Sequence, residues 1–375
     1  MALILAGVAA LLLPTAGVPA TAGARILETR VLAAPSPVPG SDNRTHLVYE
    51  VLLRNVSAQP VHLDRVEVRE PDRTGPVAVY DSPAIDRLLL DPEARTFSRT
   101  LAPGRSAALL LDVTMAPGAR VPGRLSHRFD VSGAADRTVR GAATDVGRRA
   151  PLRLSPPLQG DGYVVYGCCR PPFVHRLALM TFDGHTFAAQ RYAIDFVQTD
   201  DGVRSHTGAE DRNESYFIFG DGVRAVADGT VLAVRDGVPA NVAGKLPPRP
   251  DTADLTGNFV IQDLGGGAYA LYAHMQKGSL RVQPGDRLTR GQAIGLAGNS
   301  GNSSEPHLHF HVVDSPGLPL GVAGDSVPYT FDRFRFRNRI GGLDKEPEAP
   351  VRLPAPPTPG RAGQYPLAGD VVDFR

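Results

Sequence analysis

The amino-acid sequence predicts an all-β protein built from two domains. Its 375 residues exceed one ordinary domain and fit two, because single domains commonly hold about 100–200 residues. Its 40 glycines and 34 prolines, with few long runs of helical periodicity, are typical of short strands joined by many turns. The formal net charge of +1 provides no broad basic surface, so we expect no nucleic-acid partner.

Residues 1–24 are expected to form a signal peptide. Residues 2–13 are apolar and uncharged, and small residues at 22–24 provide a cleavage site. No Lys or Arg precedes the apolar run, but Pro14 and a length below the ~20 residues that cross a bilayer argue against a retained anchor. We therefore expect export to an extracellular, periplasmic or cell-wall location, with no stable membrane insertion after cleavage.

Residues 25–133 are expected to form an accessory domain, an immunoglobulin-like β-sandwich. Segments that alternate apolar and polar residues lie at 45–56, 61–68, 106–115 and 124–131. Short strands at this spacing are typical of antiparallel sandwiches. Its histidines are scattered and are better explained as surface or packed residues than as ligands. We therefore expect a spacer, docking or wall-targeting module.

Residues 134–174 are rich in Arg, Gly and Pro and are expected to form a linker. This segment contains the two cysteines, Cys168 and Cys169. Neighbouring cysteines rarely bridge, because a disulfide needs Cα atoms farther apart than the 3.8 Å of a trans peptide. We expect two thiols rather than a redox pair.

Residues 175–335 are expected to form the second β-rich domain, and residues 336–375 a Pro-rich tail that ends in poorly ordered chain. Asp183-Gly184 is a turn signal within a likely hairpin of the second domain.

The most informative local pattern of this domain is His307-Leu308-His309-Phe310-His311. Strand side chains alternate between faces, so the three imidazoles share one face while Leu308 and Phe310 face a core. Such a cluster can bind a divalent metal. The simpler interpretation is the solvated face of an edge strand.

Two further patterns mean little alone. Tyr272-Ala273-His274 closes an apolar strand, where a histidine is usually structural, and Asp195 closes another, where a cap is the ordinary explanation. Taken together and in order, these patterns with VQPGDRLTRGQAIGLAGNSG (282–301) and EPHLHFHV (305–312) resemble the lysostaphin/LytM-type zinc metallopeptidases. The resemblance spans residues 175–335.

The resemblance implies a compact β fold, the duplicated hybrid motif, and hydrolysis of peptide cross-links in bacterial peptidoglycan. It implies a bound Zn²⁺ ion, with Asp195 and His309 at two of the three ligand positions. It places His274 and His307 beside the zinc-bound water, as general base and transition-state stabiliser.

The resemblance also suggests two residues that line the substrate groove, Tyr272 and Asn299.

One position departs from the family pattern. The family's H-x-x-x-D motif has a histidine ligand four residues before the aspartate, where this chain has Arg191. A guanidinium offers no lone pair and cannot bind zinc. His175 is the first candidate substitute, because a three-residue turn at 183–184 would place it on the face of Asp195, whereas a two-residue turn would not.

Other substitutes remain open at this point. His206 lies in a polar insertion, His185 lies at the turn, and His311 points beyond the usual ligand position. Alternatively Asp211 is the ligand, although its spacing from His206 places the two side chains on opposite faces of a strand.

We therefore hypothesise a secreted zinc metalloendopeptidase that hydrolyses peptidoglycan. The alternative is a catalytically degenerate relative that binds wall peptide or regulates another wall hydrolase. A third class, the sugar-phosphotransfer proteins that share the architecture, is disfavoured by the export signal and the motifs, since a fold alone does not fix function.

Overall fold

A computed structural model describes residues 25–134, 137–169, 174–182, 185–200, 204–248, 254–317, 324–341, 351–353 and 360–375. The expected signal peptide, residues 1–24, lies outside the described residues. The helical elements of the described residues are short: α1 (Ser82–Ile85) and the 3-10 turns η1 (Val174–Leu177) and η2 (Asn213–Ser215). None of these helices is long and apolar enough to cross a membrane. The all-β prediction is confirmed.

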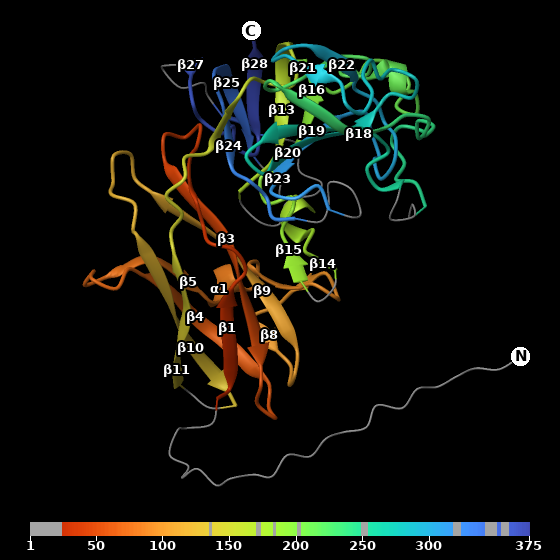
Figure 1. The fold of residues 1–375 in the computed structure, drawn as a ribbon. Coiled ribbons are helices and arrows are strands. Elements are labelled where there is room, and N and C mark those ends of the chain that lie inside the picture. The colour runs from red at the N-terminus through yellow and green to blue at the C-terminus, as the bar shows by residue number, and fades with distance from the viewer. Residues whose placement is uncertain are drawn as a thin grey trace, which may run out of the picture.

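The N-terminal unit consists of two antiparallel sheets (Figure 1). In order across the first sheet lie β1 (Leu27–Val31), β3 (Thr45–Asn55), β9 (Ser106–Met115), β6 (Leu89–Asp91) and β7 (Thr96–Phe97), with β2 (Pro37–Pro39) also on β3. In order across the second lie β11 (Arg137–Asp145), β10 (Arg124–Gly133), β4 (Val61–Arg69) and β5 (Pro76–Asp81), with β8 (Thr100–Leu101) also on β4.

The period-two pattern of β3 explains how the sandwich also contacts the second unit. Tyr49 and Val51 face the core between the two sheets. Val48 faces the other way and joins the hydrophobic core of the C-terminal unit. Glu50, also buried, lies on that second face. The strand is therefore covered on both sides, and the two units share a packed interface.

The C-terminal unit is built on an 11-stranded sheet. Its strands in order are β21 (Arg287–Leu288), β18 (Gly229–Arg235), β19 (Asn258–Gly265), β20 (Ala268–Met275), β23 (Leu308–Val313), β16 (Ile194–Gln198), β13 (Gly160–Gly167), β28 (Asp370–Phe374), β25 (Phe334–Gly341) and β26 (Val351–Leu353), with β27 (Gly360–Arg361) on β25. Three strand pairs complete the unit: β12 (Leu152–Leu154) with β24 (Tyr329–Phe331), β14 (Met180–Phe182) with β15 (His185–Phe187), and β17 (Gly222–Arg224) with β22 (Ala293–Leu296).

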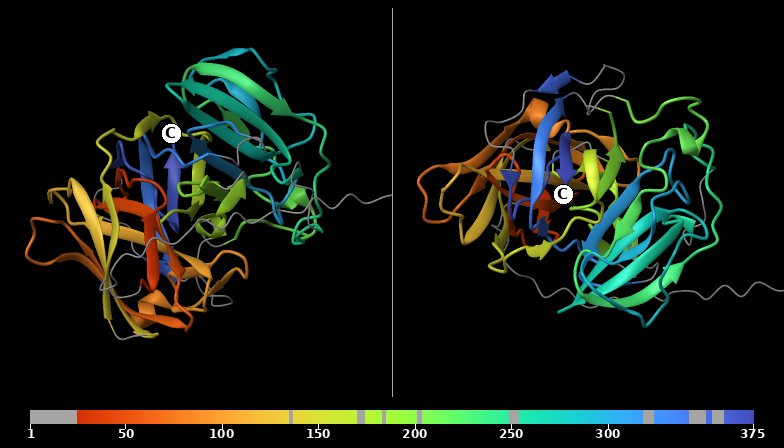
Figure 2. Two further views of the ribbon diagram at one scale, coloured as in Figure 1. Left: turned by 60° about the horizontal axis from the view of Figure 1, so that its bottom comes forward. Right: turned by 90° about the horizontal axis from the view of Figure 1, so that it is seen from above.

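The structure corrects the expected boundaries of linker and tail. The segment 134–174 contributes β11 to the sandwich and β13 to the C-terminal sheet. The segment 336–375 contributes β28, which pairs with both β13 and β25 (Figures 1 and 2). Both segments are rich in Pro or Gly, but strands form between those residues. In β28, Val371, Val372 and Phe374 are buried. The ordered chain end is therefore part of the sheet.

The cysteines also differ from expectation. Cys168 and Cys169 form a disulfide with each other. The peptide bond between them is cis, and their Cα atoms are 3.0 Å apart. The expectation of two thiols assumed a trans peptide.

Candidate metal and catalytic site

Three neighbouring strands bring the candidate residues together. In the registers of β16, β23 and β20, Asp195 lies opposite His309, and His309 lies opposite Ala273. Alternation along β23 sends Leu308 and Phe310 into the core, as the pattern of the sequence predicts. The opposite face of these strands therefore forms the floor of the site.

The Asp195 carboxylate is the centre of this floor. One carboxylate oxygen lies 2.7 Å from His309 Nδ1 and 3.6 Å from His307 Nε2. The other lies 3.1 Å from His175 Nε2. Burial alone would raise the pKa of Asp195, but His175, His307 and His309 outweigh it and hold the pKa well below its usual range. The carboxylate is therefore ionised and ready to bind a cation.

His175 reaches the site by a route that neither hairpin register predicts. The hairpin pairs Met180 with Phe187 and Phe182 with His185, so the paired strands do not include position 175. The turn Asp183-Gly184 lies outside the described residues. His175 instead belongs to the 3-10 turn η1, and its buried imidazole packs edge-on against His309, with ring centroids 5.1 Å apart.

The donor atoms of His175, Asp195 and His309 fit a metal ion. All three lie within 4.8 Å of one another. A tetrahedral zinc ion with bonds of about 2.1 Å holds its ligand atoms about 3.4 Å apart. The set of two imidazoles and one carboxylate suits zinc. On the far side of His309, Nε2 lies 2.8 Å from His311 Nδ1, a second contact of the kind that orients a metal-binding histidine.

A bulge in β20 delivers His274 to the same face. Between paired positions, β19 advances from Asn258 to Val260 while β20 spans one residue more, from Met275 to Tyr272. Within this bulge His274 has a φ of 61°, a left-handed conformation that a non-glycine residue rarely adopts. The side chain of His274 therefore leaves the core face, which Tyr272 and Met275 occupy.

His274 and His307 face each other across the site, with ring centroids 4.7 Å apart. His274 Nδ1 lies 2.8 Å from the Ser300 carbonyl, and His307 Nδ1 lies 2.8 Å from the Glu305 carbonyl. A carbonyl only accepts, so each ring donates through Nδ1 and keeps the lone pair on Nε2. Burial lowers the pKa of His274 well below its usual range, which keeps that imidazole neutral.

The two residues expected in a substrate groove lie elsewhere. Tyr272 is in the core, and its hydroxyl donates to Gln262 Oε1 at 2.7 Å. Asn299 is fully buried and accepts a hydrogen bond from Ser303 Oγ at 2.7 Å. Ser303 Oγ in turn lies 3.2 Å from His307 Nδ1, so Asn299 supports the site from behind.

Arg191, which stands at the family's ligand position, turns away from the site. Its guanidinium contacts the Glu50 carboxylate of the sandwich at 2.6 and 2.9 Å. Both side chains are buried, with 4% and 1% of their surface exposed. No contact joins Arg191 to Asp195 among the described residues.

The remaining sequence candidates lie outside this cluster. The His206 ring packs against Tyr216 at a tilt, with ring centroids 4.8 Å apart, and Asp211 is exposed. His185 is exposed on the hairpin. Within the described part of the chain, His175 is the histidine that completes a group with Asp195 and His309.

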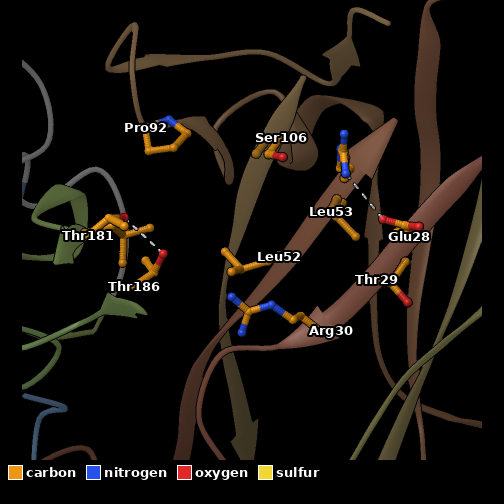
Figure 3. A pocket seen from close by; sticks show the side chains of 12 residues that line it. Glu28, Thr29, Arg30, Leu52, Leu53, Pro92, Ser106, Thr181 and Thr186 are labelled. Carbon is orange, nitrogen blue, oxygen red and sulfur yellow. Dashed lines mark hydrogen bonds and ion pairs between the residues drawn. The ribbon is translucent and has the colours of Figure 1, made fainter. Parts of the chain in front are cut away.

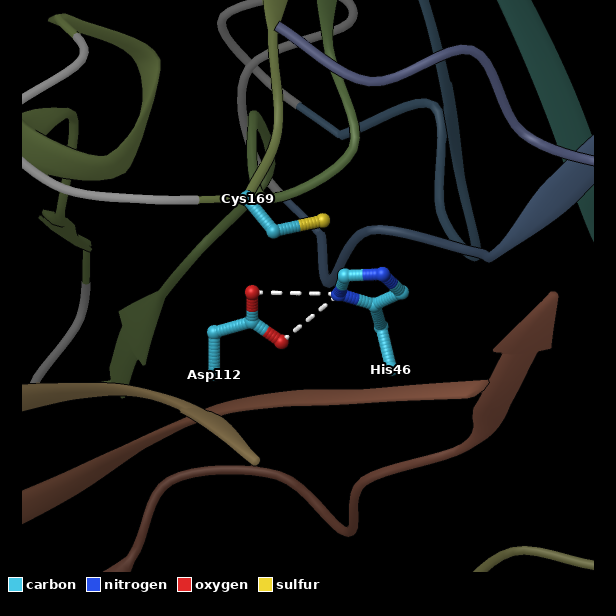
Figure 4. Close-up of side chains that lie close together, drawn as sticks. All are labelled: His46, Asp112 and Cys169. Atoms are coloured by element: carbon cyan, nitrogen blue, oxygen red, sulfur yellow. Dashed lines mark hydrogen bonds and ion pairs between the residues drawn. The ribbon is translucent and has the colours of Figure 1, made fainter. Parts of the chain in front are cut away.

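A second polar cluster does not fit a metal. His46, Asp112 and Cys169 converge at the interface of the two units (Figure 4). The Cys169 sulfur is bonded to Cys168 and supplies no thiolate. Burial would lower the pKa of His46, but hydrogen bonds to Asp112 and Asp42 raise it to about 9, so this imidazole carries a charge of its own.

A cavity of about 390 Å³ lies between the sandwich and the β14–β15 hairpin (Figure 3). Thr181 and Thr186 face Leu52 and Arg30 across it. None of the residues around Asp195 lines this space. The cavity is therefore separate from the candidate site.

Glu50 is the residue that sequence reasoning missed. It stands at a polar position of an alternating strand, a place that normally faces solvent. Its pairing with Arg191 joins residues far apart in the chain and leaves no mark on a single sequence.

Comparisons with known proteins bear on the same region. Residues 215–319 match the Peptidase family M23, a range that contains His274, His307 and His309 but not His175 or Asp195. The peptidoglycan DD-endopeptidase ShyA of Vibrio cholerae is 30% identical over 102 residues, which are 27% of this chain and 23% of that protein. Endolysin 2638A of Staphylococcus phage 2638A is 37% identical over 78 residues, which are 20% of this chain and 16% of that protein.

The matched stretch thus spans less than a quarter of either relative. Among solved structures, a variant of the catalytic domain of the prophage-encoded M23 protein EnpA from Enterococcus faecalis is 22% identical, with a TM-score of 0.26, and the match covers 48% of this chain and 95% of that one. The family match covers the motifs that resemble the lysostaphin/LytM type, so residues 215–319 of this chain are similar to Peptidase family M23.

Proposed function

We propose that the chain is an exported zinc metalloendopeptidase that cleaves peptide cross-links of bacterial peptidoglycan. The observation that carries this proposal is the convergence of His175, Asp195 and His309 on one point, with His274 and His307 beside it. His175 thereby supplies the third ligand that Arg191 cannot.

His175, Asp195 and His309 are the residues that would hold the ion. A zinc ion bound by them would lower the pKa of a coordinated water towards ~7 and would polarise a scissile carbonyl. Asp195 contributes the negative charge of the ligand set and holds His175 and His309 on its two oxygens. His311 fixes the ring orientation of His309 from the far side.

His274 and His307 act on protons and charge. Each ring is fixed by a backbone carbonyl at Nδ1 and presents the Nε2 lone pair. A neutral imidazole accepts a proton from the attacking water and, once protonated, stabilises negative charge on the substrate or returns the proton to the leaving amine.

The choice of substrate rests on the relatives. One is named a peptidoglycan DD-endopeptidase and another an endolysin. The family match itself contains His274, His307 and His309. The apolar segment at residues 2–13 supports export to the compartment where peptidoglycan lies.

Zinc content of the purified chain tests the proposal. We expect about one zinc per chain in the wild type, by mass spectrometry of metals, and at least a tenfold loss of affinity in His175→Ala, because two protein ligands remain. His206→Ala is the matched control, since that histidine packs against Tyr216 outside the cluster. The wild type should also release soluble peptides from purified peptidoglycan.

Two outcomes would contradict the proposal. Zinc that survives His175→Ala unchanged would remove His175 from the ligand set. A wild type that takes up no zinc after refolding with excess metal would exclude the hydrolase and leave the alternative, a protein that binds wall peptide or regulates another wall hydrolase.

A further inference from the structure

The segment of η1, the 3-10 turn that carries His175, packs against the N-terminal sandwich. Leu177 and Leu179, which follow it, pack against Leu90, Ala108 and Leu110 on the outer face of the β6–β9 pair. These contacts are apolar and come from the other structural unit. The backbone next to His175 therefore depends on the sandwich for its position.

Arg176, the residue after His175, makes polar contacts with the sandwich. The Arg176 side chain is fully buried and pairs with Glu50 Oε1 at 3.1 Å. Arg176 Nη1 donates to the Cys169 carbonyl at 2.8 Å, and Nη2, which also contacts Glu50, reaches the Tyr49 and Leu111 carbonyls at 3.4 Å. Arg176 is thus held by two strands of the sandwich.

Glu50 holds the second ligand segment as well. The same carboxylate binds Arg191, four residues before Asp195. Burial would raise the pKa of Glu50, but Arg191 and Arg176 outweigh it and lower the pKa, so the group is an anion between two cations. One carboxylate of the sandwich therefore contacts both chain segments that carry the ligands His175 and Asp195.

His175 lacks the support that metal-binding histidines usually have. Such a residue generally donates its second ring N–H to a carboxylate or carbonyl, which fixes the ring. The His175 Nδ1 atom is buried and has no hydrogen-bond partner among the described residues. Apart from its contacts with Asp195 and His309, the ring therefore depends on the backbone of η1 for its position.

We propose that Glu50 is a positioning residue for the metal centre, so that the N-terminal sandwich is a structural part of that centre. This rests on the proposed function, in which His175 is a zinc ligand. In this arrangement Arg191, at the family's ligand position, pairs with Glu50 and does not face the metal site. Glu50 also pairs with Arg176 and so holds the segment of His175, the replacement ligand.

The test compares full-length Glu50→Gln with Glu67→Gln, a matched change at another largely buried, Arg-paired glutamate of the sandwich that lies away from the interface. We expect Glu50→Gln to weaken zinc binding about 10- to 100-fold in competition with a chromophoric chelator, as loss of an outer-shell partner commonly does. Glu67→Gln should change the affinity by less than about threefold.

A rescue separates positioning from general damage. Arg191→His, added to Glu50→Gln, restores an imidazole four residues before Asp195. We expect the double variant to recover zinc affinity, and a further His175→Ala change to leave it unaltered. A double variant that stays as weak as Glu50→Gln would contradict the proposal that His175 replaces a ligand at position 191.

Hydrogen exchange of the metal-free protein supplies a readout that does not need zinc. Amides of η1 should exchange faster in Glu50→Gln than in the wild type and remain protected in Glu67→Gln. If the wild type binds no zinc, the proposed function fails, yet this comparison still decides whether Glu50 holds η1. If Glu50→Gln does not fold, Leu179→Ala offers a milder change, because it removes apolar contacts between the segment after η1 and the sandwich. It should weaken zinc binding severalfold. Unchanged exchange and unchanged zinc affinity would overturn the proposal.

Discussion

The two histidines that flank the ligand set differ from the ligands in what their rings contact. His307 keeps Nδ1 on the Glu305 carbonyl and directs Nε2 towards Asp195 at 3.6 Å. It therefore presents a lone pair beside Asp195 without belonging to the group that would hold the metal. A residue of this kind affects proton transfer rather than metal affinity.

We expect His307→Ala to retain zinc at the wild-type level while the rate of peptide release falls about 10²–10⁴-fold, the usual contribution of a general acid or base. Metal analysis and turnover of peptidoglycan, measured on the same preparation, check this. His185→Ala, at an exposed position of the hairpin, serves as the control and should change neither. Loss of zinc together with activity would instead make His307 a ligand.

A site residue could be predicted from the sequence where it belongs to a motif of the family. Asp195, His274, His307 and His309 stand at motif positions, and the structure places all four on one face. Tyr272, which the resemblance suggests for the substrate groove, lies in the core, and the bulge at His274 breaks the period of two between the two residues. No local pattern in a sequence marks a bulge of this kind. The role of Glu50 depends on contacts between segments that are distant in the chain, so it could not be predicted from the sequence.

Strands were predictable wherever a full alternating segment lay between turn signals. Residues 106–115 form one strand with those bounds, and residues 61–68 fall within β4. The short strand β28 was missed because its five residues follow Pro-rich chain and show no alternation. Its burial on both faces comes from β13, β25 and the core around them, which are tertiary features.

This strand provides the prediction at the scale of elements. Phe374 is 2% exposed and packs on Tyr163, Phe196 and Phe331. We expect Phe374→Ala to lower the free energy of unfolding by about 3–5 kcal/mol, the usual cost of an aromatic cavity, as measured by guanidinium denaturation. Arg375→Ala, one residue on and exposed, should stay within about 0.5 kcal/mol. Equal stability of the two variants would show that β28 does not pack in the sheet.

At the scale of the whole molecule, buried charge runs along the interface of the two units. Glu50, Arg176 and Arg191 form one part of it. His46 lies between Asp112 and Asp42 in another, below Cys169 (Figure 4). Ionised groups that are held by partners in the folded chain make its stability depend on pH.

His46 gives this dependence a definite sign. Its folded pKa of about 9 lies above the ordinary 6.5, because the carboxylates of Asp112 and Asp42 overcome the opposing effect of burial. The stabilisation is therefore fully present below pH 6.5 and is lost as the pH rises through 9, with an upper limit on the order of 3 kcal/mol. Urea denaturation at pH 6.5 and 9.5 should show this loss in the wild type and in a His62→Gln control, but not in His46→Gln. A loss of the same size in His46→Gln would assign the effect to other groups.

The left-handed backbone of His274 has a consequence for how this chain changes over generations. Glycine adopts that conformation without a steric penalty, whereas a residue with a Cβ atom is disfavoured there by about 1 kcal/mol or more. Mutation and drift alone would therefore favour replacement of this histidine by glycine, because the fold would gain stability. Under the proposed function, the part that His274 plays in proton transfer is what would oppose that replacement.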